Sequence, residues 1–502
     1  MNPGIDLGTT YSMIAHVNAF GHPALFPDLN DAGQFRTASA VYLGQHGCLI
    51  GGAADDLLEE APDAQVARFV KSLLTRPDYC YPDHHGREWN AIGLSALILR
   101  KMLRDATVFS GEDIGVTVLT VPAQFTDEQR RATRAAALLA GLEDVRLVEE
   151  PVAAAAYYGQ EEGEADRTLL VYDFGGGTFD VTILQTSPDG LFVLASDGDA
   201  GLGGRHIDQA IMELTDAEMR GRIGASPLAD VAASQRLRRV AEEAKISLSR
   251  PGSPGVRRSV LLLGQPWDFT LSRAQLDAVA EPAVAASIAA CERCLAQAGL
   301  DWRDLDKVMM TGGSSLLPQA AAALSARWGR PVSDLSLKQP HQAVAFGAAI
   351  LAHRFAGDPD SRIRLRQVAT TDLCVRVRDP QTGAPALETL IARNTPLPAA
   401  GRRTVYTSRA DQTHVTLEFV QVRGEGAETS LGRFAFGPIL APRADYPVEL
   451  DIVCNAEGLV KVTARDPLTG RSIDRVLQED GGGAIPIESQ RPLVASVSLG
   501  AY

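Results

Sequence analysis

Three consecutive glycines interrupt an apolar stretch at residues 168–184, TLLVYDFGGGTFDVTIL, and this feature restricts the fold more than any other. The apolar runs on both sides predict two strands joined by a tight turn. Glycines there cost backbone entropy, and that cost is offset where the chain must come close to a ligand. Asp173 and Asp180 flank the turn. We therefore predict a phosphate-binding turn, with a purely structural hairpin as the alternative. The residues concerned are Gly175, Gly176, Gly177 and Thr178.

A second glycine turn lies near the start of the chain, in GIDLGTT at residues 4–10. It shares with the first an apolar strand, an aspartate, a glycine turn and a threonine. Backbone N–H groups in such a turn can cradle phosphate oxygens, and the hydroxyls of Thr9 and Thr10 add donors. Asp6 can hold a hydrated Mg²⁺, because this ion keeps several waters and takes few carboxylates. The repeat predicts a duplicated unit whose turns face one site, and an ordinary β-turn is the alternative.

Two further glycine turns favour a nucleotide as the ligand. GDAGLGGRHID at 198–208 leads into a predicted helix, whose N-terminus favours anions. TGGSS at 311–315 follows a predicted strand, KVMM. The pattern GxxxxGK[ST] does not occur in the sequence, so none of these turns is a Walker A loop. The residues that we expect to contact the ligand are Gly203, Gly204, Gly312, Gly313 and Ser314.

The charge balance argues against polyanionic partners. Lys and Arg number 48 and Asp and Glu number 62, which leaves a net charge of −14. Binding to nucleic acid or to a membrane surface through positive charge needs cations facing phosphate, so we expect neither. The N-terminal MNPGIDLGTT lacks a signal-peptide pattern, no apolar stretch is long enough to span a membrane, and cysteines number only six. These features predict a cytoplasmic protein.

The pattern of elements changes once along the chain. Apolar β-type runs first alternate with helical segments, which is α/β composition, and short alternating strands follow. One predicted helix, 127–140, has Thr126 at its N-cap and Gln129 at the capping-box position. The predicted parts are an α/β domain at 1–357, a polar interdomain linker at 358–368, a compact all-β domain at 369–480 and a flexible tail at 481–502.

The order of the motifs resembles that of one family, the DnaK-type seventy-kilodalton heat-shock chaperones. The segment LIARNTPLP at 390–398 is similar to part of that family's peptide-binding β-sandwich. The chain is thus identified as a divergent bacterial-type member of the family. The motifs that carry the resemblance are GIDLGTT, VPAQF at 121–125, EQRRAT at 128–133, VEEPVAAAAYYG at 148–159, DFGGGTFD, LGGRHID, EEAKISLS at 242–249 and GGSSLLP at 312–318.

The resemblance implies a fold and a function. The first domain would be an actin-like ATPase of two duplicated lobes, followed by a small β-sandwich that binds peptides. Hydrolysis of Mg²⁺-bound ATP to ADP and phosphate would modulate the binding of unfolded or client polypeptides, in protein folding and the stress response. A J-domain co-chaperone and a nucleotide exchange factor are the further partners that it implies. Only 22 residues follow residue 480, too few for the family's helical lid.

The catalytic residues follow from the same resemblance. Lys71 matches the lysine that positions the attacking water and the γ-phosphate. Glu150 and Asp173 match the carboxylates that orient this water and the metal shell, and Thr178 completes the set. Asp6 and Asp173 would hold Mg²⁺ through water. Phosphoryl transfer to water needs mainly positioning and charge neutralisation, which these residue types supply.

One helix would contact the nucleoside. Glu242, Lys245 and Ser249 match the family's helix that touches ribose and adenine, and their spacing places them along one helix face. A solvated helix face is the alternative for these three residues.

The resemblance also implies contacts outside the nucleotide site. Pro122 and Arg130, together with Glu150, match a relay that connects the nucleotide state to the peptide domain. Four apolar residues fall where the family lines its peptide pocket, although apolar strand positions are also ordinary core. They are Val375, Tyr406, Val415 and Leu417.

The sequence departs from the family at several positions. Tyr11 stands where asparagine is usual, and Leu316 replaces an arginine expected to stack on adenine. Arg364 and Arg366 interrupt the apolar run of the linker, and arginine is costly to bury without partners. We therefore expect altered nucleotide affinity and altered coupling between the domains. The alternative functions are a specialised, non-folding partner-binding ATPase and an actin-like small-molecule kinase.

Overall fold

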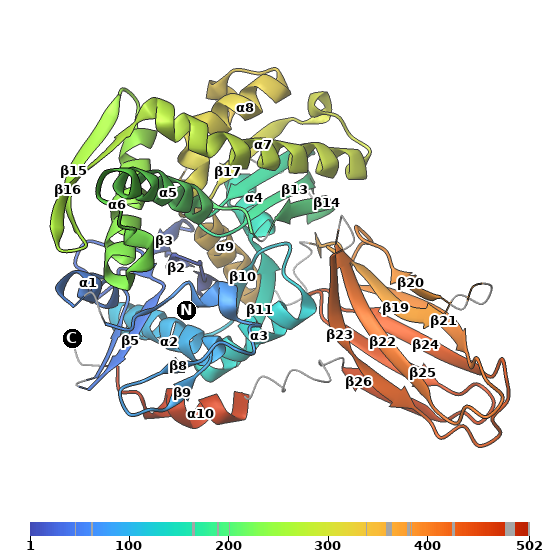
Figure 1. The fold of residues 1–502 in the computed structure, drawn as a ribbon. Coiled ribbons are helices and arrows are strands. Elements are labelled where there is room, and N and C mark those ends of the chain that lie inside the picture. The colour runs from blue at the N-terminus through green and yellow to red at the C-terminus, as the bar shows by residue number, and fades with distance from the viewer. Residues whose placement is uncertain are drawn as a thin grey trace.

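The structure is a computed structural model. The chain forms two α/β units and a β-sandwich, and a C-terminal helix lies apart from the sandwich, beside the first unit (Figure 1). No helix in the described ranges combines the length and the apolarity needed to cross a bilayer. The described residues are 1–45, 47–61, 64–162, 166–187, 190–199, 201–337, 339–357, 364–378, 382, 384–423, 427–476 and 487–499.

The first sheet is built around the N-terminal glycine turn. Its strands run in the order β11-β10-β1-β2-β3, with β4 beside β2. Side chains alternate between its faces, so Ile14 packs towards α2 and α3, whereas Met13 and Ala15 pack towards α4 and α9. The elements are β1 (Gly4–Asp6), β2 (Tyr11–Val17), β3 (Pro23–Leu25), β4 (Thr37–Ala38), β10 (Thr117–Val121), β11 (Val145–Glu149), α2 (Ala91–Ser110), α3 (Asp127–Leu139), α4 (Glu150–Glu162) and α9 (Ala343–Gly357).

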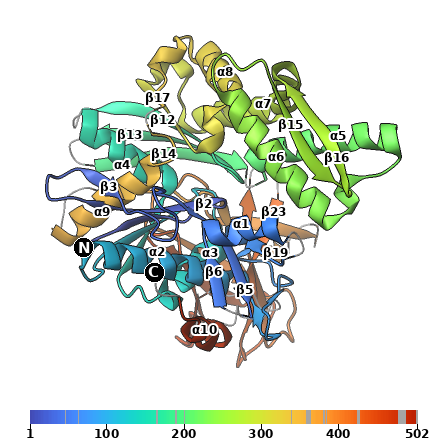
Figure 2. The same ribbon diagram turned by 90° about the vertical axis from the view of Figure 1, so that its left-hand side faces the viewer.

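The second sheet is built around the triple-glycine turn, in the order β17-β12-β13-β14-β18. Tyr172 and Phe174 pack into the core with α5, α6 and α7, whereas Val171 packs towards α4 and α9. These two helices therefore lie between the sheets (Figure 2). The elements are β12 (Arg167–Phe174), β13 (Phe179–Ser187), β14 (Gly190–Asp199), β17 (Lys307–Thr311), β18 (Arg364–Arg366), α5 (Gly204–Ile223), α6 (Val231–Ser249), α7 (Arg273–Ala298) and α8 (Pro318–Trp328).

The two sheets share a strand pattern. In each, a strand with an aspartate as its last or next-to-last residue pairs antiparallel with the next strand and parallel with a later one: β1 with β2 and β10, and β12 with β13 and β17. The glycine turns follow the first strand of each set. The remaining elements of these units are β5 (Ala40–Gly44), β6 (Gly47–Ile50), α1 (Gly52–Glu60), β7 (Ala67–Arg68), η1 (Val70–Leu73), β8 (Tyr81–Pro82), β9 (Glu88–Trp89), η2 (Pro227–Ala229), β15 (Gly255–Leu262), β16 (Gln265–Ser272), η3 (Trp302–Asp304), η4 (Gly313–Leu316) and η5 (Val332–Asp334).

Helix α3 begins where the sequence predicted. The Thr126 hydroxyl accepts from the Gln129 N–H, and the Gln129 side chain accepts from the Thr126 N–H. This confirms the capping box, which satisfies two backbone donors that the first helical turn would otherwise leave unpaired.

A sandwich of two four-stranded sheets follows, in the orders β20-β19-β22-β23 and β21-β24-β25-β26. One core joins both sheets, with Phe419 from one and Val448 and Leu450 from the other. Alternate residues of β24 are buried, as expected for a sheet with one face against a core. The strands are β19 (Asp372–Arg378), β20 (Pro385–Ile391), β21 (Ala399–Tyr406), β22 (Val415–Arg423), β23 (Ala427–Phe436), β24 (Pro447–Cys454), β25 (Val460–Arg465) and β26 (Ser472–Val476).

The described part of the predicted linker is an ordered strand. Of residues 358–368, 358–363 lie outside the described residues, and Arg364–Arg366 form β18, which pairs parallel with β14. Leu365 packs against the core beside α4 and α9, whereas Arg366 is exposed. The strand alternation therefore lets the linker dock while Arg366 stays in water, which the sequence analysis did not foresee.

The predicted tail contains a helix, so the expectation of a flexible segment is wrong for these residues. Ile487–Ser496 form α10, which lies beside α2 (Figure 1). Val494 and Val497 are buried in the core of the first unit. Arg100 donates to the carbonyl oxygens of Val494 and Val497 near the C-terminal end of α10, where cations are favoured. A short segment with few apolar residues gives no periodic signal, and its partner is distant in sequence.

Changing Val494 to Asp should detach α10 from the first unit. Burial of a valine side chain is worth about 1.5–3 kcal/mol, and placing a carboxylate in this apolar core is costly as well. We expect amide hydrogen exchange in Ala91–Arg100 to become roughly 10–100 times faster, because α10 no longer covers it. Ala495→Asp, at the exposed neighbouring position, is the matched control and should leave this exchange unchanged. Equal exchange in both variants would contradict the packing described here.

Candidate active site

The glycine turns predicted from the sequence lie against one another. The N–H of Gly204 donates to the carbonyl of Gly175 at 3.0 Å. The Ser314 hydroxyl donates to the same carbonyl at 2.9 Å, and the N–H of Arg205 donates to the carbonyl of Gly176 at 2.9 Å. The turns after β12, β14 and β17 therefore form one connected backbone cluster.

There is no room for side chains where these turns meet. A Cβ atom on Gly203 would lie 2.7 Å from backbone atoms of Gly177. One on Gly176 would lie 2.8 Å from the hydroxyl oxygen of Thr10, which joins the N-terminal turn to the cluster. Glycine is thus required because segments of the chain approach one another closely. The absence of side chains also leaves backbone N–H donors accessible to a ligand.

Gly203→Ala should impair this cluster. The added methyl must push the two turns apart, and overpacking of this kind costs about 1–3 kcal/mol. We expect roughly tenfold or greater loss of nucleotide affinity, measured by calorimetric titration with ATP analogues. Gly221→Ala lies on the same helix with no atom within 4 Å of the added carbon, and should bind normally. Equal affinities for both variants would show that the turns do not form the ligand site.

Lys71 projects from a strained turn. Phe69 has a φ of 60°, in the left-handed region, directly before the short helix η1 that carries Lys71. The Lys71 ammonium lies 2.7 Å from Oε1 of Glu150, the first residue of α4, and both residues are buried. It also lies 5.5 Å from the centre of the Phe125 ring. The pair thus joins two predicted catalytic residues from distant parts of the chain.

Carboxylates gather around this pair. Burial and the negative charge of Glu150 raise the pKa of Asp6 to about 7, although Lys71 lowers it. Burial raises the pKa of Asp173 well above its usual value, and Glu150 and Asp180 raise it further. A Cβ on Gly312 would lie 2.6 Å from the Asp173 carboxylate, so this group sits at the glycine cluster. The site is short of positive charge.

A divalent cation would supply that charge. Among the described residues, no three His, Cys, Asp or Glu side chains are placed to enclose an ion. Magnesium keeps several waters and is usually bound by one or two carboxylates together with phosphate oxygens. Asp6 and Asp173 therefore suit an ion held largely through water. The positive charge of a bound ion would lower the raised pKa values of both carboxyl groups.

The helix α6 brings Lys245 to the same cluster. The Lys245 ammonium lies 2.7 Å from Oδ1 of Asp208 and donates to the carbonyl of Gly204 at 3.2 Å. Burial raises the pKa of Asp208 to about 6, and Lys245 opposes this shift. Glu242 is half-buried one turn earlier, and the Ser249 hydroxyl donates to the Lys245 carbonyl. Lys245 thus contacts the glycine cluster, whereas Glu242 and Ser249 do not bond to it.

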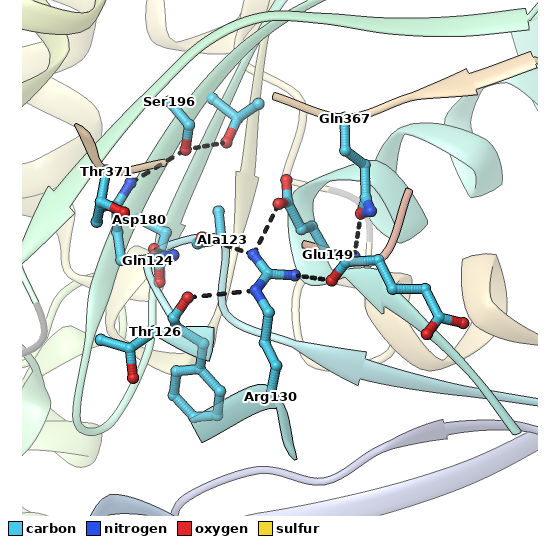
Figure 3. A network of polar contacts seen from close by, with 12 residues as sticks. Ala123, Gln124, Thr126, Arg130, Glu149, Asp180, Ser196, Gln367 and Thr371 are labelled. Carbon is cyan, nitrogen blue, oxygen red and sulfur yellow. Dashed lines mark hydrogen bonds and ion pairs between the residues drawn. The ribbon is translucent and has the colours of Figure 1, made fainter. Parts of the chain in front are cut away.

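Arg130 occupies the centre of a second polar network, at the sandwich (Figure 3). Its guanidinium donates to Oε1 of Glu149 at 2.9 Å and to the carbonyl oxygens of Ala123 and Phe125. It also donates to the carbonyl of Glu457, in the sandwich, at 3.3 Å. Pro122 lies at the start of the turn that supplies these carbonyls. Of the residues predicted as a relay, Arg130 therefore lies at the domain interface, and Pro122 lies in the turn that it binds.

Glu149 and Glu150 connect the two networks. They are adjacent, at the end of β11 and the start of α4, yet Glu149 pairs with Arg130 and Glu150 pairs with Lys71. Glu150 was predicted for both the catalytic site and the relay, and in the structure it is its neighbour Glu149 that pairs with Arg130. The Gln367 side chain accepts from the Glu149 N–H and donates to the Ala456 carbonyl, so the linker joins the same contact.

The sandwich contacts both α/β units. On the first unit, the Val460 N–H donates to Oδ1 of Asp127 at 2.7 Å, and Arg131 donates to the Val460 carbonyl at 2.8 Å. On the second, the Ser196 N–H donates to Asn394, within the LIARNTPLP segment. A cavity of about 20 Å³, room for about one water, remains between Arg130 and the linker. A shift of one unit against the other would therefore disturb the docked sandwich.

Comparison with known proteins agrees with the motifs and the geometry. A family model described as "Hsp70 protein" matches residues 65–488. The chaperone protein DnaK of Methanothermobacter thermautotrophicus is 34% identical over 478 residues, which are 93% of this chain and 78% of that protein. The chain belongs to the Hsp70 family. It is an ATP-dependent chaperone and an ATPase.

The predicted peptide-contacting residues of this Hsp70-family chain lie mostly in the sandwich core. Val375, Val415 and Leu417 are all buried there, in agreement with the alternative given above, and Tyr406 is 61% exposed. The structure does not bring these four side chains together as one open pocket. A peptide pocket at these positions stays a prediction.

Two departures from the family pattern can be placed. The Tyr11 ring lies under the guanidinium of Arg36, 4.2 Å from its centre. Leu316, in η4, is 38% exposed next to the glycine turn at 311–315. An exposed leucine offers apolar contact but no cation to a neighbouring base, so its effect on nucleotide affinity stays a prediction.

Sequence reasoning missed several residues that the structure brings into these networks. Glu149 was given no role because both roles were assigned to its neighbour Glu150. Two adjacent glutamates at the end of a strand could have suggested two different partners. Asp127 carries no motif signal, because its partner Val460 lies far away in sequence, and Asp208, the last residue of LGGRHID, was given no role of its own. Arg205 was quoted as part of LGGRHID but given no role.

Proposed function

We propose that the glycine cluster binds the phosphates of ATP and that Lys71 and Glu150 position the water that attacks the terminal phosphate. The observation that carries this proposal is the buried 2.7 Å pair of Lys71 and Glu150, with Asp6 and Asp173 close enough for the charge of Glu150 to raise the pKa of both. Bound Mg²⁺ supplies charge neutralisation when present. The two sheets, with α4 and α9 between them, would be the duplicated lobes of an actin-like domain.

The chain's own residues would work by position and charge. The Lys71 ammonium faces the carboxylate side of the site and can hold a phosphate oxygen or a water. The Glu150 carboxylate accepts from Lys71 and has a second oxygen that can accept from the water. Thr178, whose carbonyl accepts from the Gly175 N–H, closes the turn that presents backbone donors. Catalysis of phosphoryl transfer needs mainly the positioning of the reacting groups and the neutralisation of charge.

We further propose that ATP binding and hydrolysis control a peptide site in the sandwich. The path would run from Glu150 through Glu149 to Arg130, and from there to the sandwich and the linker. The partners in this proposal are unfolded or client polypeptides, a J-domain co-chaperone and a nucleotide exchange factor. The cytoplasmic location inferred from the sequence stays a prediction.

The experiment measures peptide release in two nucleotide states. A fluorescently labelled unfolded apolar peptide is bound to the purified chain, and its dissociation rate is measured with Mg²⁺-ATP and with Mg²⁺-ADP. The proposal expects at least a tenfold difference between the two rates. Equal rates with measurable peptide binding would favour the specialised partner-binding ATPase over a peptide-releasing chaperone.

A further inference from the structure

Arg205 lies at the meeting point of the glycine turns. It is the second residue of α5, and its N–H is bonded to the Gly176 carbonyl. A Cβ placed on Gly177 would lie 3.3 Å from the Arg205 Nη2 atom and 3.3 Å from the Thr9 hydroxyl oxygen. The guanidinium therefore reaches the two turns that we propose as phosphate ligands.

The Arg205 cation has no carboxylate partner in the described part of the chain. Its Nε atom is buried and makes no hydrogen bond, and the side chain forms no ion pair there. Burial and the nearby Arg238 lower its pKa, which shows that its surroundings do not favour the charge. Arg68, close by, differs, since its Nε lies 2.9 Å from the Asp55 carboxylate. A buried N–H donor without a partner is costly, so the unpaired Nε of Arg205 indicates that a bound anion is its partner.

Stacking holds the guanidinium against Phe69, two residues before Lys71. Its carbon lies 4.9 Å from the centre of the Phe69 ring, and Arg68 lies at the same distance from that ring. Phe69 is the left-handed residue directly before the helix that carries Lys71. A guanidinium stacked on a ring keeps its in-plane N–H donors free for hydrogen bonds. Arg205, from the second unit, thus contacts the segment of the first unit that carries Lys71.

We propose that Arg205 binds the terminal phosphate of the nucleoside triphosphate, where its guanidinium reaches the turns of Thr9 and Gly177. This inference rests on the phosphate site proposed above. Arginine binds phosphate through paired, charge-assisted hydrogen bonds, and charge neutralisation is the main demand of phosphoryl transfer. Lys71 is paired with Glu150 and Lys245 with Asp208, whereas Arg205 is available to add positive charge beside the bound ion. A diphosphate would not reach Arg205, so the residue would distinguish ATP from ADP.

The test compares two nucleotides. Calorimetric titration of the full chain with Mg²⁺ measures affinity for ADP and for the non-hydrolysable β,γ-imido analogue of ATP. For Arg205→Ala we expect at least a tenfold loss for the triphosphate analogue, with ADP affinity changed less than threefold. Arg205→Gln, which stays polar but loses the charge, should behave likewise, and Arg205→Lys should keep part of the preference. Arg220→Ala, at the exposed end of the same helix, is the matched control and should change neither.

The possible outcomes separate this inference from the proposed function. If Arg205→Ala and Arg205→Gln lose affinity for both nucleotides equally, or for neither, the inference is wrong, and Arg205 only packs against Phe69. If the unaltered chain binds neither nucleotide, the proposed phosphate site itself is wrong, and the inference with it. Thermal unfolding without nucleotide checks that each variant is folded.

Discussion

Replacing Lys71 by alanine is expected to reduce ATP hydrolysis by at least about a hundredfold. The change removes the ammonium that lies 2.7 Å from Glu150, and it leaves this carboxylate buried among Asp6 and Asp173 without a cation. Loss of one positioned donor in an active site typically costs about 10²–10³ in turnover, and the unpaired carboxylate would repel the phosphates as well. The rate is measured as phosphate release from purified protein at saturating ATP.

A matched lysine tests whether this loss is local. Lys461→Ala removes an exposed lysine paired with Asp474 in the sandwich, far from the turns, and should leave hydrolysis unaltered. The Lys71 variant should still bind ATP, since the backbone donors of the glycine cluster remain. If it keeps more than a tenth of the normal rate, Lys71 does not have the role proposed here.

Replacing Arg130 by alanine is expected to uncouple the sandwich from the ATPase domain. The guanidinium bonds to three carbonyl groups and to Glu149, which is fully buried. Breaking a buried ion pair on one side costs about 3–5 kcal/mol, because the remaining charge stays in the interior. Arg130 also opposes the rise that burial imposes on the pKa of Glu149, so its loss favours protonation of that carboxyl. The stability change is measured by urea unfolding.

The neighbouring Arg134 provides the control for this second prediction. It pairs with Glu457 across the same interface, but both side chains are partly exposed, so Arg134→Ala should cost no more than about 1 kcal/mol. Hydrogen exchange in β24 and β25 should rise for Arg130→Ala and change little for Arg134→Ala. Equal effects of the two variants would mean that Arg130 is merely one of several surface contacts.

The glycine turns could be predicted because their signal is local. Three glycines between apolar runs have few explanations, and the structure shows the cause, since a Cβ on Gly203 would lie only 2.7 Å from the Gly177 backbone. The capping box at Thr126 was predictable for the same reason, since its partners are three residues apart. Lys71 carried no such signal. A single helical lysine could be placed in the site only through family resemblance.

Contacts between segments far apart in the chain could not be predicted from the sequence. Glu149 and Glu150 look equivalent, and only the change from strand to helix sends one to Arg130 and the other to Lys71. The docking of α10 depends on Arg100, almost 400 residues earlier. The linker arginines argued against docking, because the alternation that exposes Arg366 exists only once β18 pairs with β14. In each case the missing information was the partner.

The most direct test of the central claim is steady-state ATP hydrolysis by the purified chain, with and without an unfolded apolar peptide. The contacts from Lys71 through Glu150, Glu149 and Arg130 to the sandwich predict that peptide raises the hydrolysis rate several-fold. They also predict that the increase is lost in Arg130→Ala, while its basal rate persists. A hydrolysis rate that does not change with bound peptide would contradict coupling between the two domains.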